Sequence, residues 1–140
     1  MTTIATDGKS MAGDGLLTGN GIVHGFDFRK VFRLADGRIA GFCGDSYALP
    51  AVVEWLNNGG NLPDIDPENF EGLILHPDGR CQSVNGKGQM IDQPVPAVTG
   101  SGGAIALGAM LAGASPTEAV DIACQRDCKT GGQIITKWIA

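Results

Sequence analysis

Three Asp-Gly dipeptides each divide a pair of short, largely apolar runs, and this pattern constrains the fold more than any other feature of the chain. They are Asp7-Gly8, Asp36-Gly37 and Asp78-Gly79. Aspartate and glycine both tolerate the positive φ that the central residues of a type I′ turn require, so such a pair between apolar runs favours a β-hairpin. The sequence therefore predicts three hairpins, each closed by a type I′ turn. The 22 glycines support this interpretation, because they lie mostly at turns and between apolar runs.

Helical patterns lie between and after the hairpins. Leu49, Val52, Val53 and Leu56 follow the spacing of one helix face, with Pro50 in the first turn, and the Asn-Asn-Gly-Gly run at 57–60 ends this helix. Residues 103–111 predict a second helix of small residues. Ser115-Pro116-Thr117-Glu118 is a capping box for a third helix, which we expect to run to about Cys128.

The order of these elements predicts the fold class. After the third helix, residues 133–139 have the composition of a strand. The chain is thus β-rich, then one helix, then β-rich, then a helix pair, then β. This order predicts an α+β fold with antiparallel sheets, and the length of 140 residues predicts a single domain over 1–140.

Charge and composition exclude several classes of function. Ten Lys and Arg against 15 Asp and Glu give a formal net charge of −5, without a basic run, so we expect no nucleic-acid partner. The longest apolar stretch, 104–112, is too short to span a bilayer, and the N-terminus has no secretory pattern. We therefore expect a cytoplasmic protein without membrane contacts. The four cysteines are then reduced thiols, and their spacing predicts no structural zinc.

The N-terminal threonine carries the main chemical signal. Met1 precedes Thr2 at the head of a predicted strand, and a methionine before a small residue is the kind that is normally removed. Its removal would leave Thr2 with a hydroxyl and a free α-amine, whose ordinary pKa is about 7.7–8. Near neutral pH such an amine can accept the hydroxyl proton, so that nucleophile and base lie on one residue.

The chain resembles the proteasome β-subunit family, in particular the bacterial HslV type, through six motifs in the same order. In chain order they are Thr2-Thr3-Ile4, Ala12-Gly13-Asp14-Gly15, Arg29-Lys30-Val31, Ala40-Gly41-Phe42-Cys43-Gly44, Gly100-Ser101-Gly102-Gly103 and Arg126-Asp127-Cys128-Lys129-Thr130-Gly131-Gly132. Each motif is weak alone, whereas their collinearity from residue 2 to residue 132 is specific. The last has Thr where the family has Ser.

The resemblance implies an N-terminal nucleophile hydrolase with a four-layer αββα sandwich of antiparallel sheets, here with a reduced helical layer. It implies a threonine-type endopeptidase that cleaves through an acyl-enzyme. The implied catalytic residues are Thr2 as nucleophile, Lys30 with its paired Asp14, Gly44 as oxyanion donor through its backbone N–H, and Ser101, Asp127 and Thr130 around the amine.

The resemblance also implies partners and a cation. The substrate is a peptide or an unfolded protein, and the expected state is a homo-oligomeric ring, served by an ATPase unfoldase on a separate chain. No cofactor is required, but some relatives bind Na⁺ or Mg²⁺ through backbone carbonyls of the 124–130 turn, which here are those of Cys124, Asp127 and Thr130. The expected outcome of Thr2→Ala or Lys30→Ala is lost turnover with folding nearly intact, because neither residue is expected to fill the core.

Two alternatives remain open from the sequence. One is an N-terminal nucleophile amidase that acts on small amides through the same Thr2. The other is a non-catalytic ring or scaffold subunit that retains Met1. The presence of both Asp14 and Lys30 favours an active enzyme over the scaffold.

Overall fold

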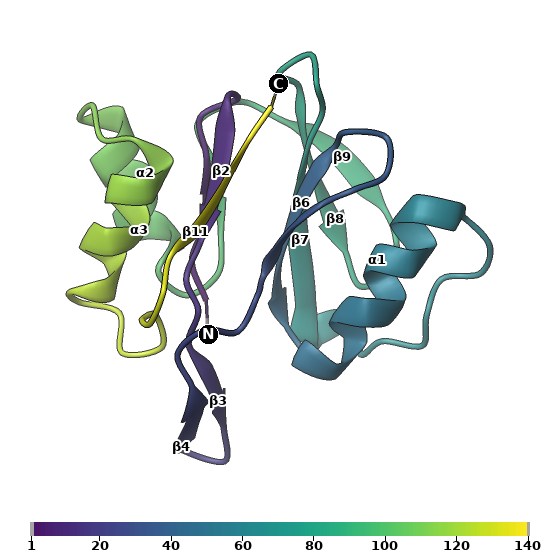
Figure 1. The fold of residues 1–140 in the computed structure, drawn as a ribbon, viewed down its shortest axis with the longest axis horizontal. Helices are drawn as coiled ribbons and strands as arrows, with labels where there is room; N and C mark the ends of the chain where they lie inside the picture. The colour runs from purple at the N-terminus through teal and green to yellow at the C-terminus, as the bar shows by residue number, and fades with distance from the viewer. Residues whose placement is uncertain (1, 140) are drawn as a thin grey trace.

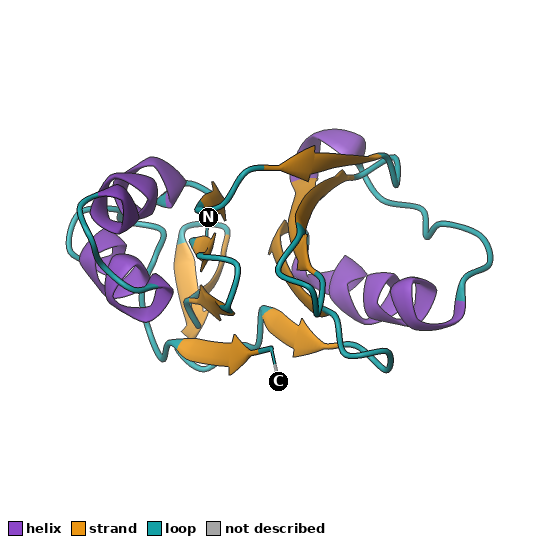
Figure 2. Ribbon diagram, turned by 90° about the horizontal axis from the view of Figure 1, so that it is seen from above, coloured by secondary structure: helices purple, strands orange, loops and turns teal. Residues whose placement is uncertain are grey.

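The computed structural model describes residues 2–139, and its helices and strands form four layers (Figures 1 and 2). The α2–α3 pair forms one outer layer and α1 the other, with two β-sheets between them (Figure 2). The helices are α1 (Leu49–Asn58), α2 (Gly103–Leu111) and α3 (Pro116–Cys124). This arrangement confirms the predicted αββα sandwich, and the single helix α1 confirms the reduced helical layer.

The two inner layers are antiparallel sheets. One has four strands in the order β10-β1-β2-β11, with β1 at Ile4–Thr6, β2 at Ser10–Gly13, β10 at Ala97–Thr99 and β11 at Ile135–Trp138. The other has five strands in sequence order, with β5 at Val31–Arg33, β6 at Ile39–Gly44, β7 at Phe70–Leu75, β8 at Cys81–Asn85 and β9 at Met90–Gln93. A separate hairpin pairs β3 (Leu17–Gly19) with β4 (Ile22–Gly25).

Alternation along the strands builds the core on both faces of each sheet. In β1, Ile4 lies in the cluster between the sheets, and the next residue, Ala5, lies in the cluster under α2 and α3. The helices meet this sheet through small residues such as Ala106 and Ala119, so they approach it closely. On the other side, Leu49, Val52 and Leu56 of α1 pack on the outer face of the five-stranded sheet.

The three predicted hairpins are confirmed, but the predicted turn type is wrong. Asn20 is the one non-glycine residue within 2–139 with a positive φ, so Asp7, Asp36 and Asp78 do not adopt the type I′ conformation. Each aspartate instead accepts a hydrogen bond on its carboxylate from the backbone N–H two residues later, and the following glycine has a φ of about +90°. The side chain thus closes the turn, and only the glycine needs the left-handed conformation.

Other elements differ from the predictions at their ends or were not predicted. The third helix ends at Cys124 rather than near Cys128, and the last strand begins at Ile135 rather than residue 133. Strands β9 and β10 were not predicted, and neither was the β3–β4 hairpin, whose Asn20-Gly21 turn has positive φ at both residues. None of the helices within residues 2–139 has the length and apolar character needed to cross a bilayer.

Candidate active site

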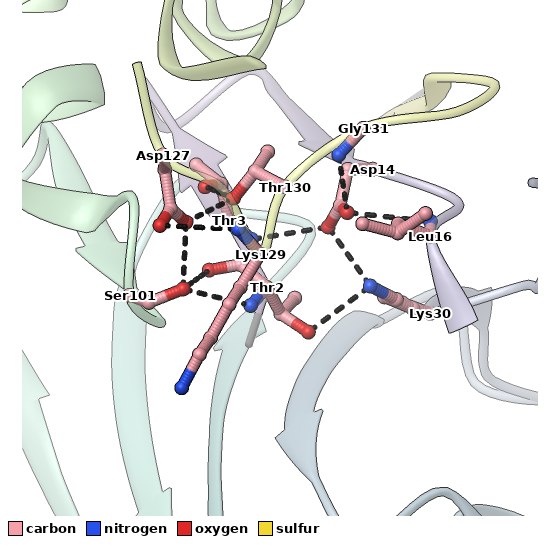
Figure 3. Close-up of polar contacts among 10 residues, drawn as sticks. All are labelled: Thr2, Thr3, Asp14, Leu16, Lys30, Ser101, Asp127, Lys129, Thr130 and Gly131. Carbon is pink, nitrogen blue, oxygen red and sulfur yellow. Dashed lines mark hydrogen bonds and ion pairs between the residues drawn. The ribbon is translucent and has the colours of Figure 1, made fainter. Parts of the chain in front are cut away.

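Residues from five separate segments meet at the start of β1 (Figure 3). Thr2 immediately precedes this strand and is only 3% exposed. Asp14 follows β2, and Lys30 immediately precedes β5. Ser101 lies in the turn between β10 and α2, and Asp127 lies in the turn after α3. The four-stranded sheet and its connections supply four of these segments, and the start of β5 in the five-stranded sheet supplies Lys30.

Lys30 joins the hydroxyl of Thr2 to a buried carboxylate. Its ammonium group donates to Thr2 Oγ1 at 3.1 Å and to Asp14 Oδ1 at 3.0 Å, and the whole side chain is 5% exposed. Burial lowers the pKa of Lys30 from its ordinary 10.5, because desolvation penalises the ammonium, and the attraction of Asp14 offsets only part of this effect. A cation therefore contacts the Thr2 oxygen in a place that excludes most water.

Asp14 is held by backbone groups as well as by Lys30. The Thr3 N–H donates to Oδ1 at 3.0 Å, and the N–H groups of Leu16 and Gly131 donate to Oδ2 at 3.3 and 3.1 Å. Four donors thus surround a carboxylate that is 1% exposed, which compensates the cost of burying its charge. The same contacts fix the backbone of residue 3 against the turn that ends near residue 131.

A second hydrogen-bonded chain runs from the Thr2 nitrogen to Asp127. Thr2 N–H donates to Ser101 Oγ at 3.2 Å, and the Ser101 hydroxyl donates to Asp127 Oδ2 at 2.6 Å. The Thr130 hydroxyl also donates to Asp127. Thr3 Oγ1 lies 2.7 Å from Thr130 Oγ1, and since the single Thr130 proton is directed to Asp127, Thr3 is the donor of that bond.

Asp127 remains ionised in this network. Burial raises the pKa of its carboxyl group, but the hydrogen bonds from Ser101, Thr130 and the Lys129 N–H outweigh that effect and hold the pKa below the ordinary 3.8. The ionised Asp127 carboxylate accepts a hydrogen bond from the Ser101 hydroxyl. The Ser101 oxygen is thereby oriented as an acceptor toward the nitrogen of Thr2.

Two glycines allow the turn before α2 to contact the start of β1. Gly100 has a φ of +97°, and a Cβ atom there would lie 2.0 Å from the Thr2 carbonyl oxygen. A Cβ atom at Gly102 would lie 2.0 Å from Thr3 Oγ1. Side chains at these positions would therefore displace residues 2 and 3 from the hydrogen bonds described above.

The site opens into two neighbouring hollows. A small cleft of about 50 Å³ is lined by Thr2, Lys30, Phe42 and Gly44, among others. A larger cavity of about 850 Å³ lies between the Ser101 turn and the five-stranded sheet, and the two hollows share Cys43 and Gly44 as walls. Burial raises the pKa of the Cys43 thiol, so Cys43 is not primed to be a competing nucleophile.

The structure brings together most of the residues that the sequence singled out. Hydrogen bonds connect Thr2, Asp14, Lys30, Ser101, Asp127 and Thr130, and Gly44 lines the cleft against Thr2. Cys124 ends α3 and is partly buried. Met1 lies outside the described residues. The expectation that Lys30 lies outside the core is wrong, because both Lys30 and its partner Asp14 are buried, so we now expect Lys30→Ala to destabilise the fold.

Three groups of the site were not predicted from the sequence. These are the Thr3 hydroxyl and the backbone N–H groups of Leu16 and Gly131. A backbone donor leaves no mark in the residue type, so Leu16 could not have been found. Thr3 and Gly131 do lie within the motifs of the resemblance.

Comparisons with known proteins find similar structures, but no matching family model or curated protein. No protein-family model matches the chain, and no curated protein matches it. Thiobacillus denitrificans BPH superposes with a TM-score of 0.74 at 17% identity, over 99% of this chain and 98% of that chain. Its complex with epoxomicin gives 0.67 at the same identity and coverage. Eukaryotic HslV from Trypanosoma brucei gives 0.73 at 19% identity, over 97% of both chains.

This chain therefore has the fold that BPH and HslV share, and the likeness extends over nearly its full length.

Proposed function

We propose that this chain is a threonine peptidase with Thr2 as its N-terminal nucleophile. The observation that carries the proposal is the Lys30 ammonium, which bridges the Thr2 hydroxyl and the buried Asp14 carboxylate at 3.1 and 3.0 Å. A lysine that is buried at the cost of desolvation and directed at a hydroxyl oxygen favours the alkoxide character that attack requires. A scaffold subunit has no need of this arrangement.

Removal of Met1 would turn the Thr2 N–H into an amine, and the site would then hold a complete nucleophile. The amine would keep its hydrogen bond to Ser101 and use its lone pair to take the hydroxyl proton, directly or through a water. Thr2 Oγ1 then bonds to the substrate carbonyl carbon, the C–N bond breaks, and the proton passes to the leaving nitrogen. Water hydrolyses the resulting ester, and the Gly44 N–H would stabilise the oxyanion in both steps.

The shape of the site favours a peptide over a small amide. The large cavity shares Cys43 and Gly44 with the cleft at Thr2, and it shares Glu68 and Asn85 with a further hollow of about 450 Å³. The three hollows thus adjoin one another, and we infer that together they form a groove that leads away from the proposed nucleophile. A small amide would fill only its first part, whereas an extended peptide can lie along it.

A covalent probe tests the nucleophile directly. BPH has been solved in complex with epoxomicin, a reagent that needs both a free α-amine and the adjacent hydroxyl. We expect the intact mass of the natively purified protein to lack Met1 and to gain one epoxomicin adduct. Thr2→Ala should gain none. Retention of Met1 together with absence of an adduct would contradict the proposal and favour the scaffold alternative.

We further propose a homo-oligomer, with an ATPase unfoldase as a separate chain. Several large apolar side chains are exposed on the β3–β4 hairpin and the segment after it, including Ile22, Val23 and Phe26. Their exposure supports an interface with other copies. Sedimentation at micromolar concentration should give a single species larger than the monomer, and a stable monomer would count against this part of the proposal.

A cation on the 124–130 turn also stays a proposal. Residues 2–139 contain no group of three or more His, Cys, Asp or Glu suited to a metal, so the donors would be the backbone carbonyls of Cys124, Asp127 and Thr130. Carbonyl oxygens suit Na⁺ or Mg²⁺. The Asp127 carbonyl already accepts the Thr130 N–H at 3.2 Å, and its second lone pair could serve an ion.

The lowered pKa of Lys30 gives the reaction an alkaline limit. The ammonium form is the one that stabilises the Thr2 oxygen, and its fraction falls at a pH below the ordinary 10.5 because burial favours the neutral amine. We therefore expect the rate of epoxomicin adduct formation to rise as the Thr2 amine loses its proton and to fall again before pH 10.5. A rate that keeps rising through pH 10.5 would contradict a role for the ammonium.

A further inference from the structure

Glu71 lies in the wall of the large cavity, which shares Cys43 and Gly44 with the cleft at Thr2. It is in β7, opposite Cys43 of β6 and Asn85 of β8 in the strand register. Cys43 lines both the cavity and the cleft at Thr2. Burial is the main cause of the raised pKa of the Cys43 thiol, and the charge of the neighbouring Glu71 adds to it.

The carboxylates of the cavity have no internal counter-charge. The ion pairs within residues 2–139 are Lys30–Asp14 and Arg38–Asp36, so neither Glu71 nor the second cavity glutamate, Glu68, is paired. Both side chains are exposed to the cavity solvent. The one cationic side chain in the walls, Lys129, is on the turn after α3 beside Ser101 rather than on the five-stranded sheet.

We propose that this cavity receives a lysine or arginine side chain of a peptide substrate, and that Glu71 is the residue that selects it. The inference rests on the proposed function, because it assigns a substrate class to the same site. A peptide bound at Thr2 can extend past Cys43 and Gly44 into the large cavity, where Glu71 lies in the wall. There a long cationic side chain would form an ion pair with the Glu71 carboxylate in place of part of its hydration. An acidic side chain would be repelled by the same carboxylate.

The size of the cavity agrees with this occupant. About 850 Å³ is more than a lysine or arginine side chain fills, so the ammonium or guanidinium group keeps part of its hydration. A pair of this kind contributes modestly, because solvent screens the exposed carboxylate. We expect a preference of roughly threefold to fivefold at low salt, which weakens as the ionic strength rises.

Binding to a catalytically dead protein tests the pocket without any turnover. The probe is a pair of fluorescent octapeptides that differ only in one arginine, replaced by the isosteric but neutral citrulline, with the arginine scanned through each position. Thr2→Ala protein should bind one arginine peptide of the scan roughly threefold to fivefold more tightly than its citrulline partner. Adding Glu71→Gln should abolish the difference. Adding Glu54→Gln instead, on α1 at the other face of the sheet, changes the net charge equally and should leave the difference intact.

Cleavage by the wild-type protein provides the second readout. Products of a mixed peptide library should be enriched in lysine or arginine at one fixed position relative to the cut, and Glu71→Lys should shift that position toward aspartate or glutamate. If epoxomicin labels Thr2 but neither binding nor cleavage distinguishes arginine from citrulline, the pocket assignment is overturned while the proposed function stands. If arginine binding depends on Glu71 and epoxomicin labels nothing, the proposed function fails and the assignment of Glu71 as the residue that binds a cationic side chain stands.

Discussion

Replacing Thr2 by alanine should lower peptide turnover by about 10⁴-fold or more and abolish the epoxomicin adduct, because it removes the atom that bonds to the substrate. The rest of the site should survive this change. Lys30 keeps its 3.0 Å ion pair with Asp14, and the Thr2 backbone N–H keeps Ser101 as acceptor. The hydrogen bond from Lys30 to the hydroxyl is lost, and this loss should cost about 1 kcal/mol of the free energy of unfolding.

Thr2→Ser is the matched control for this prediction. Serine restores the oxygen that Lys30 contacts and removes only a methyl group, so turnover and the adduct should return to a measurable level. Alanine and serine are both small, and Met1 should be removed from each variant, which the intact mass verifies. Wild-type turnover in Thr2→Ala would exclude Thr2 as the nucleophile, whatever the fold.

The hairpins could be predicted from the sequence because local residue types determine them. The turn type could not, because the same residue types are compatible with more than one turn. An Asp-Gly pair between apolar runs can close a hairpin in more than one way. In the structure the Asp36 carboxylate accepts the Arg38 N–H at 3.1 Å, and Gly37 alone takes a positive φ. A side-chain hydrogen bond thus replaces the second left-handed residue, a choice that residue types alone do not reveal.

Tertiary contacts explain the elements that sequence patterns placed wrongly. The third helix ends at Cys124, four residues before the predicted end, and Asp127 then contacts Ser101 across the chain. A helix that continued to Cys128 would hold Asp127 and Thr130 in the wrong geometry for this network. The β3–β4 hairpin has an Asn-Gly turn signal that was overlooked. Its apolar residues Ile22 and Val23 are exposed, so this hairpin does not follow the pattern of one buried and one exposed face.

The site was predictable in its residue types but not in its environment. The motifs identified Lys30 and Asp14, yet nothing in the sequence states that both are buried or that Gly131, 117 residues away, donates its N–H to Asp14. That burial arises when the two sheets pack together around the start of β1. It converts an expected surface lysine into a buried ion pair, and the expected effect of mutating it changes accordingly.

Lys30→Met should therefore lose both activity and stability. Methionine keeps most of the buried aliphatic volume, but it leaves the Asp14 carboxylate without its cation in a place that is 1% exposed. Breaking a buried ion pair on one side typically costs about 3–5 kcal/mol of the free energy of unfolding. The rate of epoxomicin adduct formation should fall on the order of 10²–10³-fold, because the charge that stabilises the Thr2 oxygen is gone.

A double-mutant cycle with Asp14→Asn separates the ion pair from simple packing. Asparagine removes the charge, but its amide nitrogen faces backbone N–H groups that donate to the carboxylate, so Asp14→Asn is itself destabilising. In the Asp14→Asn background, Lys30→Met no longer leaves an unpaired anion. Its cost should then be smaller by about 1–3 kcal/mol, as measured by urea denaturation of all four proteins. Strictly additive costs would mean that Lys30 stabilises the fold through its aliphatic stem rather than through Asp14, and the electrostatic role of Lys30 at the Thr2 hydroxyl would lose its structural basis.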